Sequence, residues 1–117
     1  MSDGNSNLDL MIVMTTESNL SRASELATAI LEQGLAACVS LREVESHYLW
    51  KRKISVDREV QLLIKTKKEL VEMVISSIKK LHGYEIPELI YCPASATKDY
   101  CDWISCSAKS SLPKEIL

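Results

Sequence analysis

Residues 82–88 read His82-Gly83-Tyr84-Glu85-Ile86-Pro87-Glu88 and join a run with helical periodicity to a short β-like run. Gly83 is expected directly after the helix, where glycine adopts a left-handed backbone at little cost. Pro87 stops any helix and biases Ile86 toward an extended conformation. The segment therefore predicts a helix that ends at His82, a turn, and a strand that Glu88 enters.

Length and composition indicate one globular domain. The chain has 117 residues, which predicts a single domain over 1–117, with 1–7 and 108–117 expected to be flexible. A chain of this size buries only about two-thirds of its unfolded surface, so oligomerisation is a natural supplement. Hydrophobic residues make up 46%, which argues against general disorder. The net charge of −2, with both signs interspersed, gives no sign of a nucleic-acid surface.

The cysteines and the N-terminal segment predict a reduced, cytoplasmic protein. No CxxC pair occurs among the four cysteines, which are expected to be structural thiols: Cys38, Cys92, Cys101 and Cys106. Residues 1–7 lack the basic start and apolar stretch of a signal peptide. No apolar run approaches the roughly 20 residues of a membrane span, so no membrane partner is expected.

The first half of the chain predicts strand, helix, strand. A short continuous apolar run makes residues 8–16 a buried strand. Ser18 is a suitable N-cap for an amphipathic helix, and Gly34 closes that helix. A second strand begins at Leu35 and extends to Trp50.

The apolar alternation of this second strand changes parity. Val39 and Leu41 share one parity, whereas Val44, Tyr48 and Trp50 share the other. If one face stays buried, the strand must absorb an extra residue between Leu41 and Val44. The pattern therefore predicts a β-bulge or sharp bend at Arg42-Glu43.

The second half repeats the pattern. Lys51-Arg52-Lys53 forms a charged turn, interpreted as a solvated hairpin tip, with a binding patch as the alternative. Residues 56–66 form the third strand, and Thr66-Lys67-Lys68-Glu69 is a capping box for a second helix. Residues 89–92 form the fourth strand, and Thr97 caps a third helix. The order predicts an α+β, ferredoxin-like βαββαβ fold with an extra C-terminal helix.

Four blocks, in this order, resemble the CutA family of divalent-cation tolerance proteins from about Ile12 to Trp103. The blocks are Leu35-Ala36-Ala37-Cys38-Val39, then Tyr48 with Trp50 and Lys53-Ile54, then Leu63-Ile64-Lys65-Thr66, and finally residues 82–88. The resemblance implies a homotrimer related in shape to the PII signalling proteins. It also implies a role in tolerance or binding of divalent metals such as copper.

Three positions depart from the family pattern. Gly83 stands where relatives usually have proline, and Arg42-Glu43 stands where they usually have Pro-Gly. Some relatives carry a cysteine, proposed as a metal ligand, where this chain has Thr15. A copper site would therefore rest on His82 and Glu88, with Met14 and Thr15 as neighbours. An imidazole and a carboxylate suit such an ion, and the missing thiolate predicts weak binding.

Free sheet edges give an independent reason to expect association. The predicted second strand is longer than its partner strand. Its apolar end, roughly residues 44–50, therefore extends beyond the partner and lacks a strand to pair with. Pairing with a neighbouring subunit would bury Tyr48 and Trp50, and Tyr84 is a further interface aromatic.

No motif indicates an enzyme. The chain has no nucleophile elbow, no HExxH, and only three glycines, too few for a phosphate-binding loop. For His82 and Glu88, the alternatives to metal binding are a helix-terminal cation and a surface carboxylate. Three functions stay open: a trimer that binds divalent metal, a PII-like trimer that binds a small anion between subunits, and a scaffold trimer without a ligand.

Overall fold

The computed structural model describes residues 10–109. Of the segments expected to be flexible, 1–7 and 108–117, only residues 108–109 lie within it. There Ala108 is fully buried at the end of the last helix. The elements are, in order, β1 (Leu10–Glu17), α1 (Leu20–Glu32), β2 (Cys38–Trp50), β3 (Lys53–Lys67), a 3-10 turn η1 (Lys68–Leu70), α2 (Val71–Leu81), β4 (Ile90–Pro93) and α3 (Lys98–Ser107).

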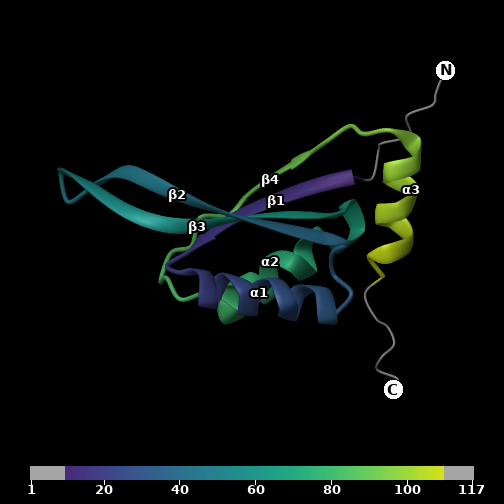
Figure 1. Ribbon diagram of the computed structural model, residues 1–117, viewed down its shortest axis with the longest axis horizontal. Helices are drawn as coiled ribbons and strands as arrows, with labels where there is room; N and C mark the ends of the chain where they lie inside the picture. Colours follow the sequence, from purple (N-terminus) through teal and green to yellow (C-terminus); the bar gives the residue numbers. More distant parts are fainter. Residues whose placement is uncertain (1–9, 110–117) are drawn as a thin grey trace.

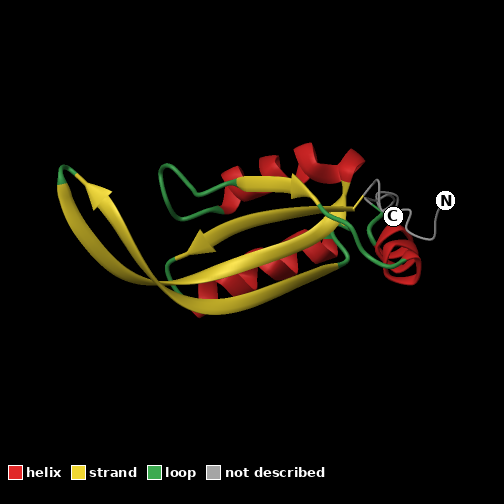
Figure 2. Ribbon diagram, turned by 90° about the horizontal axis from the view of Figure 1, so that it is seen from above, coloured by secondary structure: helices red, strands yellow, loops and turns green. Residues whose placement is uncertain are grey.

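The predicted α+β, ferredoxin-like order is confirmed. The four strands form an antiparallel sheet in the order β2-β3-β1-β4. Helices α1 and α2 lie side by side on one face of this sheet, and α3 lies at one end (Figures 1 and 2). The core lies between the two helices and the central strands. Its fully buried side chains include Val13, Leu62, Ile64, Ile30, Val74 and Ile78.

The predicted β-bulge is wrong. Strands β2 and β3 pair without interruption from Cys38↔Lys65 to Trp50↔Lys53. Since β1 pairs with β3 only as far as Val60, the outer part of the β2–β3 hairpin projects beyond the four-stranded body (Figure 1). The apolar residues after Val44 therefore lie outside the region covered by the helices. They do not have to share a face with Val39 and Leu41, which pack against the core.

Two of the three predicted helix caps are also wrong. Asn19, not Ser18, caps α1, and its side chain accepts the Arg22 N–H at 2.9 Å. Thr66 is a buried strand residue whose hydroxyl donates to the Leu35 carbonyl at 2.6 Å, so it is not part of a capping box. The structure confirms Thr97, whose side chain accepts the Tyr100 N–H at the start of α3.

The hairpin tip holds two residues in a conformation that favours glycine. Lys51 and Arg52 join β2 to β3 with φ of 52° and 68°. A two-residue hairpin loop with positive φ at both positions normally carries Asn-Gly or Gly-Gly. The left-handed conformation costs an ordinary side chain roughly 1 kcal/mol, so this turn is strained.

Arg52→Gly is expected to raise the free energy of unfolding by about 1 kcal/mol, because glycine removes that cost. Urea denaturation at a fixed protein concentration measures the change. Lys53→Gly is the matched control: it removes a neighbouring cation from a strand position and is expected to destabilise the protein. Equal stability of Arg52→Gly and the wild type would contradict the strain.

Candidate functional site

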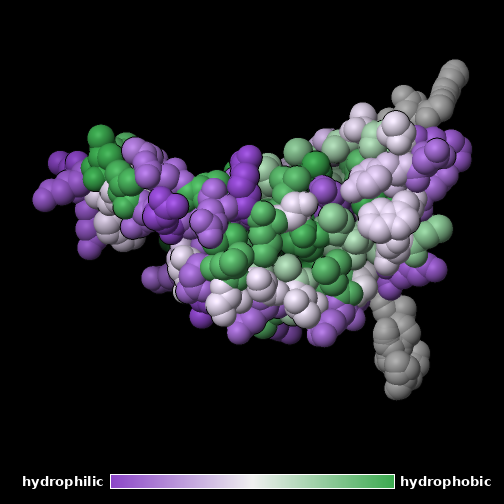
Figure 3. Space-filling view, in the orientation of Figure 1, coloured by the Kyte–Doolittle hydropathy of each residue, from purple (hydrophilic) through white to green (hydrophobic). Residues whose placement is uncertain are grey.

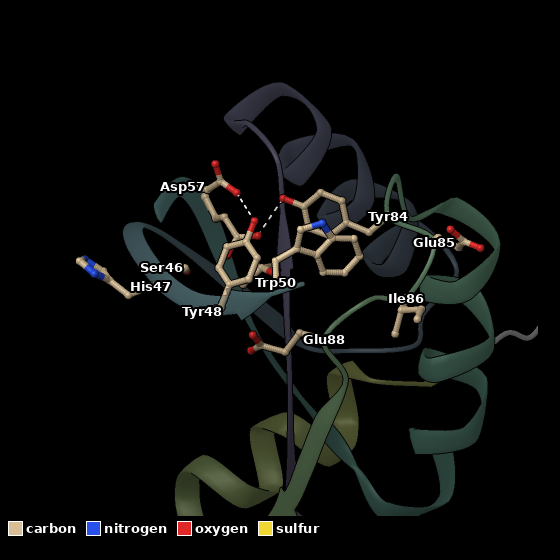
Figure 4. A pocket seen from close by; sticks show the side chains of 11 residues that line it. Ser46, His47, Tyr48, Trp50, Asp57, Tyr84, Glu85, Ile86 and Glu88 are labelled. Carbon is tan, nitrogen blue, oxygen red and sulfur yellow. Dashed lines mark hydrogen bonds between the residues drawn. The ribbon is translucent and has the colours of Figure 1, made fainter. Parts of the chain in front are cut away.

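A pocket of about 620 Å³ lies between the projecting hairpin and the loop after α2 (Figure 4). The hairpin contributes Tyr48 and Trp50 from β2 and Asp57 from β3, and the loop contributes Tyr84 and Glu88. The remaining lining residues are Thr16, Ser46, His47, Glu59, Glu85 and Ile86. Figure 4 shows that His47 and Glu85 point away from the two aromatic rings, Tyr48 and Trp50, in the middle of the view.

A buried carboxylate fixes the loop to the sheet. The side chain of Glu17, the last residue of β1, is only 1% exposed. It accepts the Gly83 N–H at 3.1 Å, the Ser18 N–H at 3.3 Å and the Arg22 Nε–H at 3.3 Å. Buried charges persist only when they are paired and hydrogen-bonded, and Glu17 is both. This carboxylate therefore joins β1, the start of α1 and the loop after α2.

His82 is the second buried link between these elements. Its side chain is 0% exposed. Its Nδ1 accepts the Tyr84 N–H at 2.9 Å, and its Nε2 is hydrogen-bonded to the Thr16 carbonyl. An amide nitrogen only donates and a carbonyl only accepts, so the ring is assigned as the neutral tautomer protonated at Nε2. In this arrangement, His82 is a structural hydrogen-bonding residue and not a helix-terminal cation.

The four residues predicted for a copper site do not converge. The Nδ1 lone pair of His82 is occupied by Tyr84, and Glu88 is exposed in the pocket wall. Met14 and Thr15 are consecutive in β1, so they face opposite sides of the sheet. Thr15 is fully buried, and its hydroxyl has no hydrogen-bond partner among residues 10–109.

Within the same residues, no group of three His, Cys, Asp or Glu side chains is placed to hold a metal ion. The donor set therefore does not fit a metal as it stands. Copper binding at His82 and Glu88 stays a prediction that requires a rearranged loop.

The three predicted interface aromatics all line the pocket, while their role between subunits stays a prediction. Tyr84 donates its hydroxyl to Glu59 at 2.8 Å, and Tyr48 donates its hydroxyl to Asp57. Burial, followed by the bond to Glu59, raises the pKa of Tyr84 well above its usual range. The bond to Asp57 raises the pKa of Tyr48. Both phenols therefore stay protonated and keep their hydroxyl protons for these hydrogen bonds.

Gly83 has a different role from the one predicted. The helix does end here, but the backbone of Gly83 is not left-handed; among the glycines of the described chain only Gly34 has a positive φ, 70°. A Cβ on Gly83 would lie 2.6 Å from the Arg22 guanidinium. Glycine therefore leaves room for Arg22 to reach Glu17.

Sequence reasoning missed Glu17, Arg22, Asp57 and Glu59. For Glu17 a signal was present, because this carboxylate ends a strand that is otherwise apolar or small. Such a residue is either at the solvent-exposed end of the strand or a buried anchor. Only the three-dimensional contacts with Arg22 and Gly83 decide between these two readings.

Comparisons with known proteins agree on one family. The sequence model described as CutA1 divalent ion tolerance protein matches residues 11–107. The "Divalent-cation tolerance protein CutA" of Pyrococcus horikoshii is 34% identical over 96 residues, covering 81% of this chain and 94% of that protein. The solved structure of CutA from Synechococcus elongatus superimposes with a TM-score of 0.84 at 33% identity, covering 87% of this chain and 92% of that chain.

A further relative bears on location. The "Protein CutA, chloroplastic" of Arabidopsis thaliana is 31% identical over 112 residues, covering 94% of this chain and 62% of that protein. None of the helices formed by residues 10–109 is long and apolar enough to cross a membrane. Because a relative carries a chloroplast name, the cytoplasmic location stays a prediction.

Proposed function

Since the chain belongs to the CutA1 divalent ion tolerance protein family, we propose that it acts in tolerance of divalent cations as a homotrimer that binds a divalent metal such as copper. The family supports the tolerance role. The projecting hairpin supports the trimer, and it is the observation that carries the proposal.

The hairpin exposes large apolar side chains that nothing among residues 10–109 covers. Leu49 is 76% exposed and Ile54 is 74% exposed, and they are directly paired across the two strands. Figure 3 shows apolar side chains gathered at this projecting end. A two-stranded hairpin is marginally stable alone in water, so a neighbouring subunit is the natural cover.

The sheet edges support the same arrangement. Strands β2 and β4 are the two outer strands of the sheet that residues 10–109 form, and within these residues each has one edge without a neighbouring strand. Strand β4 is short and exposes Ile90 and Tyr91, which are 49% and 52% exposed. Pairing β2 of one subunit with an edge of the next would close these edges in a ring.

The metal part of the proposal rests on the names of the relatives and on the two donors of the loop, His82 and Glu88. Coordination by His82 requires its Nδ1 to release the Tyr84 amide, or its Nε2 to lose its proton and the Thr16 bond. Either step opposes binding, so the affinity is expected to be weak.

Copper titration tests this proposal. Glu88→Gln and His82→Ala are each expected to weaken Cu²⁺ binding by about tenfold, roughly 1.4 kcal/mol, in isothermal titration calorimetry. His47→Ala is the control, because His47 is exposed and bonded to Glu45. Glu88→Gln is the more decisive variant, since Glu88 is exposed and its replacement leaves the core unchanged. Identical isotherms for wild type and Glu88→Gln would contradict a metal site at this pair.

A further inference from the structure

A thiol and an ammonium group lie side by side on the sheet face opposite α1 and α2. Cys38 of β2 and Lys65 of β3 are direct partners in the antiparallel register, so their side chains share one face of the sheet. Ile64, the preceding residue of β3, is fully buried in the core, so Lys65 points to the other face. Lys65 Nζ lies 3.8 Å from Cys38 Sγ and 3.3 Å from the Ser40 hydroxyl. The strand register therefore holds the amine against the sulfur.

The ammonium group of Lys65 has no acidic partner among residues 10–109. None of the ion pairs that these residues form includes it. Lysine is half-buried here, and a charge in such a place is normally paired, so a positive charge is left beside the sulfur. Reactive cysteines lie in partly exposed, electropositive surroundings, and Cys38 is partly exposed. The sequence predicts a structural thiol at Cys38, whereas its surroundings are those of a reactive one.

The other cysteines of the described chain lack this arrangement. All four are free thiols, and Cys38 alone receives a hydrogen bond from a lysine within residues 10–109. Cys101 is half-buried like Cys38, but its thiol is directed at the Ala96 carbonyl at 3.8 Å. The pairing of a thiol with an amine therefore singles out one position.

We propose that Cys38 and Lys65 form a peroxide-sensitive pair, in which oxidation of the thiol ends in an S–N bond, a sulfenamide. The peroxide O–O bond breaks, the sulfur of Cys38 becomes a sulfenic acid, and water leaves. The nitrogen of Lys65 then attacks that sulfur: the S–O bond breaks, the S–N bond forms, and a second water and a proton leave. The sulfur loses two electrons, the peroxide gains them, and the neutral chain is two hydrogen atoms lighter.

This bond closes a loop that contains the whole projecting hairpin, residues 39–64. A cross-link stabilises a protein mainly by restricting its unfolded chain, and more so for a longer loop. Oxidation is therefore expected to raise the midpoint of thermal unfolding. A thiol such as dithiothreitol attacks the sulfur and reverses the change. The pair is a redox-sensitive lock on the base of the hairpin, and it goes beyond the proposed metal role without depending on it.

Peptide mapping by mass spectrometry tests the proposal on protein treated with excess hydrogen peroxide in the presence of EDTA, so that bound copper plays no part. Cleavage after glutamate places the two residues in separate peptides, 33–43 and 60–69. The wild type is expected to give these peptides linked, two hydrogen atoms lighter than their sum, and to lose the link on reduction. Lys65→Arg keeps the positive charge and is expected to give no link, with the oxygen left on Cys38.

Lys67→Arg is the matched control, because Lys67 lies two residues further along β3 and its Nζ donates to the Ser105 carbonyl at 3.1 Å. It is expected to leave the link and the rise in unfolding midpoint unchanged. Oxidised wild type without linked peptides would overturn the proposal, as would a link that persists in Lys65→Arg or retains an oxygen atom. Linked peptides with an unchanged unfolding midpoint would overturn the lock on the hairpin.

Discussion

Glu17→Ala is expected to lower the free energy of unfolding by about 3 kcal/mol, because it removes a buried carboxylate that accepts three hydrogen bonds and leaves a cavity in its place. The carboxylate of Glu17 accepts the backbone N–H groups of Ser18 and Gly83 and so holds the start of α1 and the loop after α2 against β1. Arg22 contributes less, because its side chain is 45% exposed and can return to water. The loss should therefore come mainly from the two backbone donors and the cavity that remains.

Urea denaturation of the wild type and two companion variants separates these contributions. Glu17→Gln keeps the size and one acceptor oxygen, so its loss should be smaller than that of Glu17→Ala. Glu25→Ala, on the exposed face of α1, should change stability by no more than about 0.5 kcal/mol. If Glu17→Ala were as mild as Glu25→Ala, the carboxylate would not be the anchor of this loop.

The order of the elements could be predicted because each element carries a local signal. The apolar run of β1, the helical spacing of α1 and α2, and the glycine after α1 are readable without tertiary structure. Exact caps were less certain, because Ser18 and Asn19 are adjacent and both residue types are good caps. Thr66 was misassigned because its hydroxyl bonds across to Leu35, a contact that is distant in sequence.

The bulge prediction failed for a different reason. It assumed that every apolar residue of β2 faces one core, so a change in parity required an extra residue. The strand instead extends beyond the part of the sheet that the helices cover. Beyond Val44, apolar side chains occur on both of its faces, with Tyr48 and Trp50 on one and Leu49 on the other. An apolar pattern records burial of any kind, and burial against another chain cannot be told from burial in the chain's own core.

The site was predicted only in part, because its geometry depends on contacts between distant segments. The segment 82–88 does form one wall of the pocket, but His82 is turned into the core and bonded to Thr16 and Tyr84. Two of the acidic side chains that line the pocket, Asp57 and Glu59, come from β3, where they alternate with residues of the opposite face. Nothing local in β3 indicates that this face meets the loop after α2.

The double substitution Leu49→Glu with Ile54→Glu is expected to weaken subunit association more than 100-fold. The two side chains are paired across the hairpin and are highly exposed in the single chain. Burying such a side chain against a neighbour contributes about 1.5–3 kcal/mol, and a glutamate at the same place would have to lose its hydration. Since neither residue belongs to the core, the folded body should remain intact.

Sedimentation velocity measures this effect in the wild type and the variant. At about 10 µM protein, a dissociation constant raised 100-fold becomes visible as dissociated subunits. The wild type is expected at three times the chain mass of 13.1 kDa, and the double variant at the mass of one chain with an unchanged circular dichroism spectrum. Lys51→Glu is the control, because it adds negative charge to the same hairpin at the turn without replacing an apolar side chain. A double variant that stays trimeric would show that the apolar side chains of the hairpin do not hold the subunits together. A wild type that sediments as one chain would reject the trimer itself, and the exposed hairpin would then need another partner.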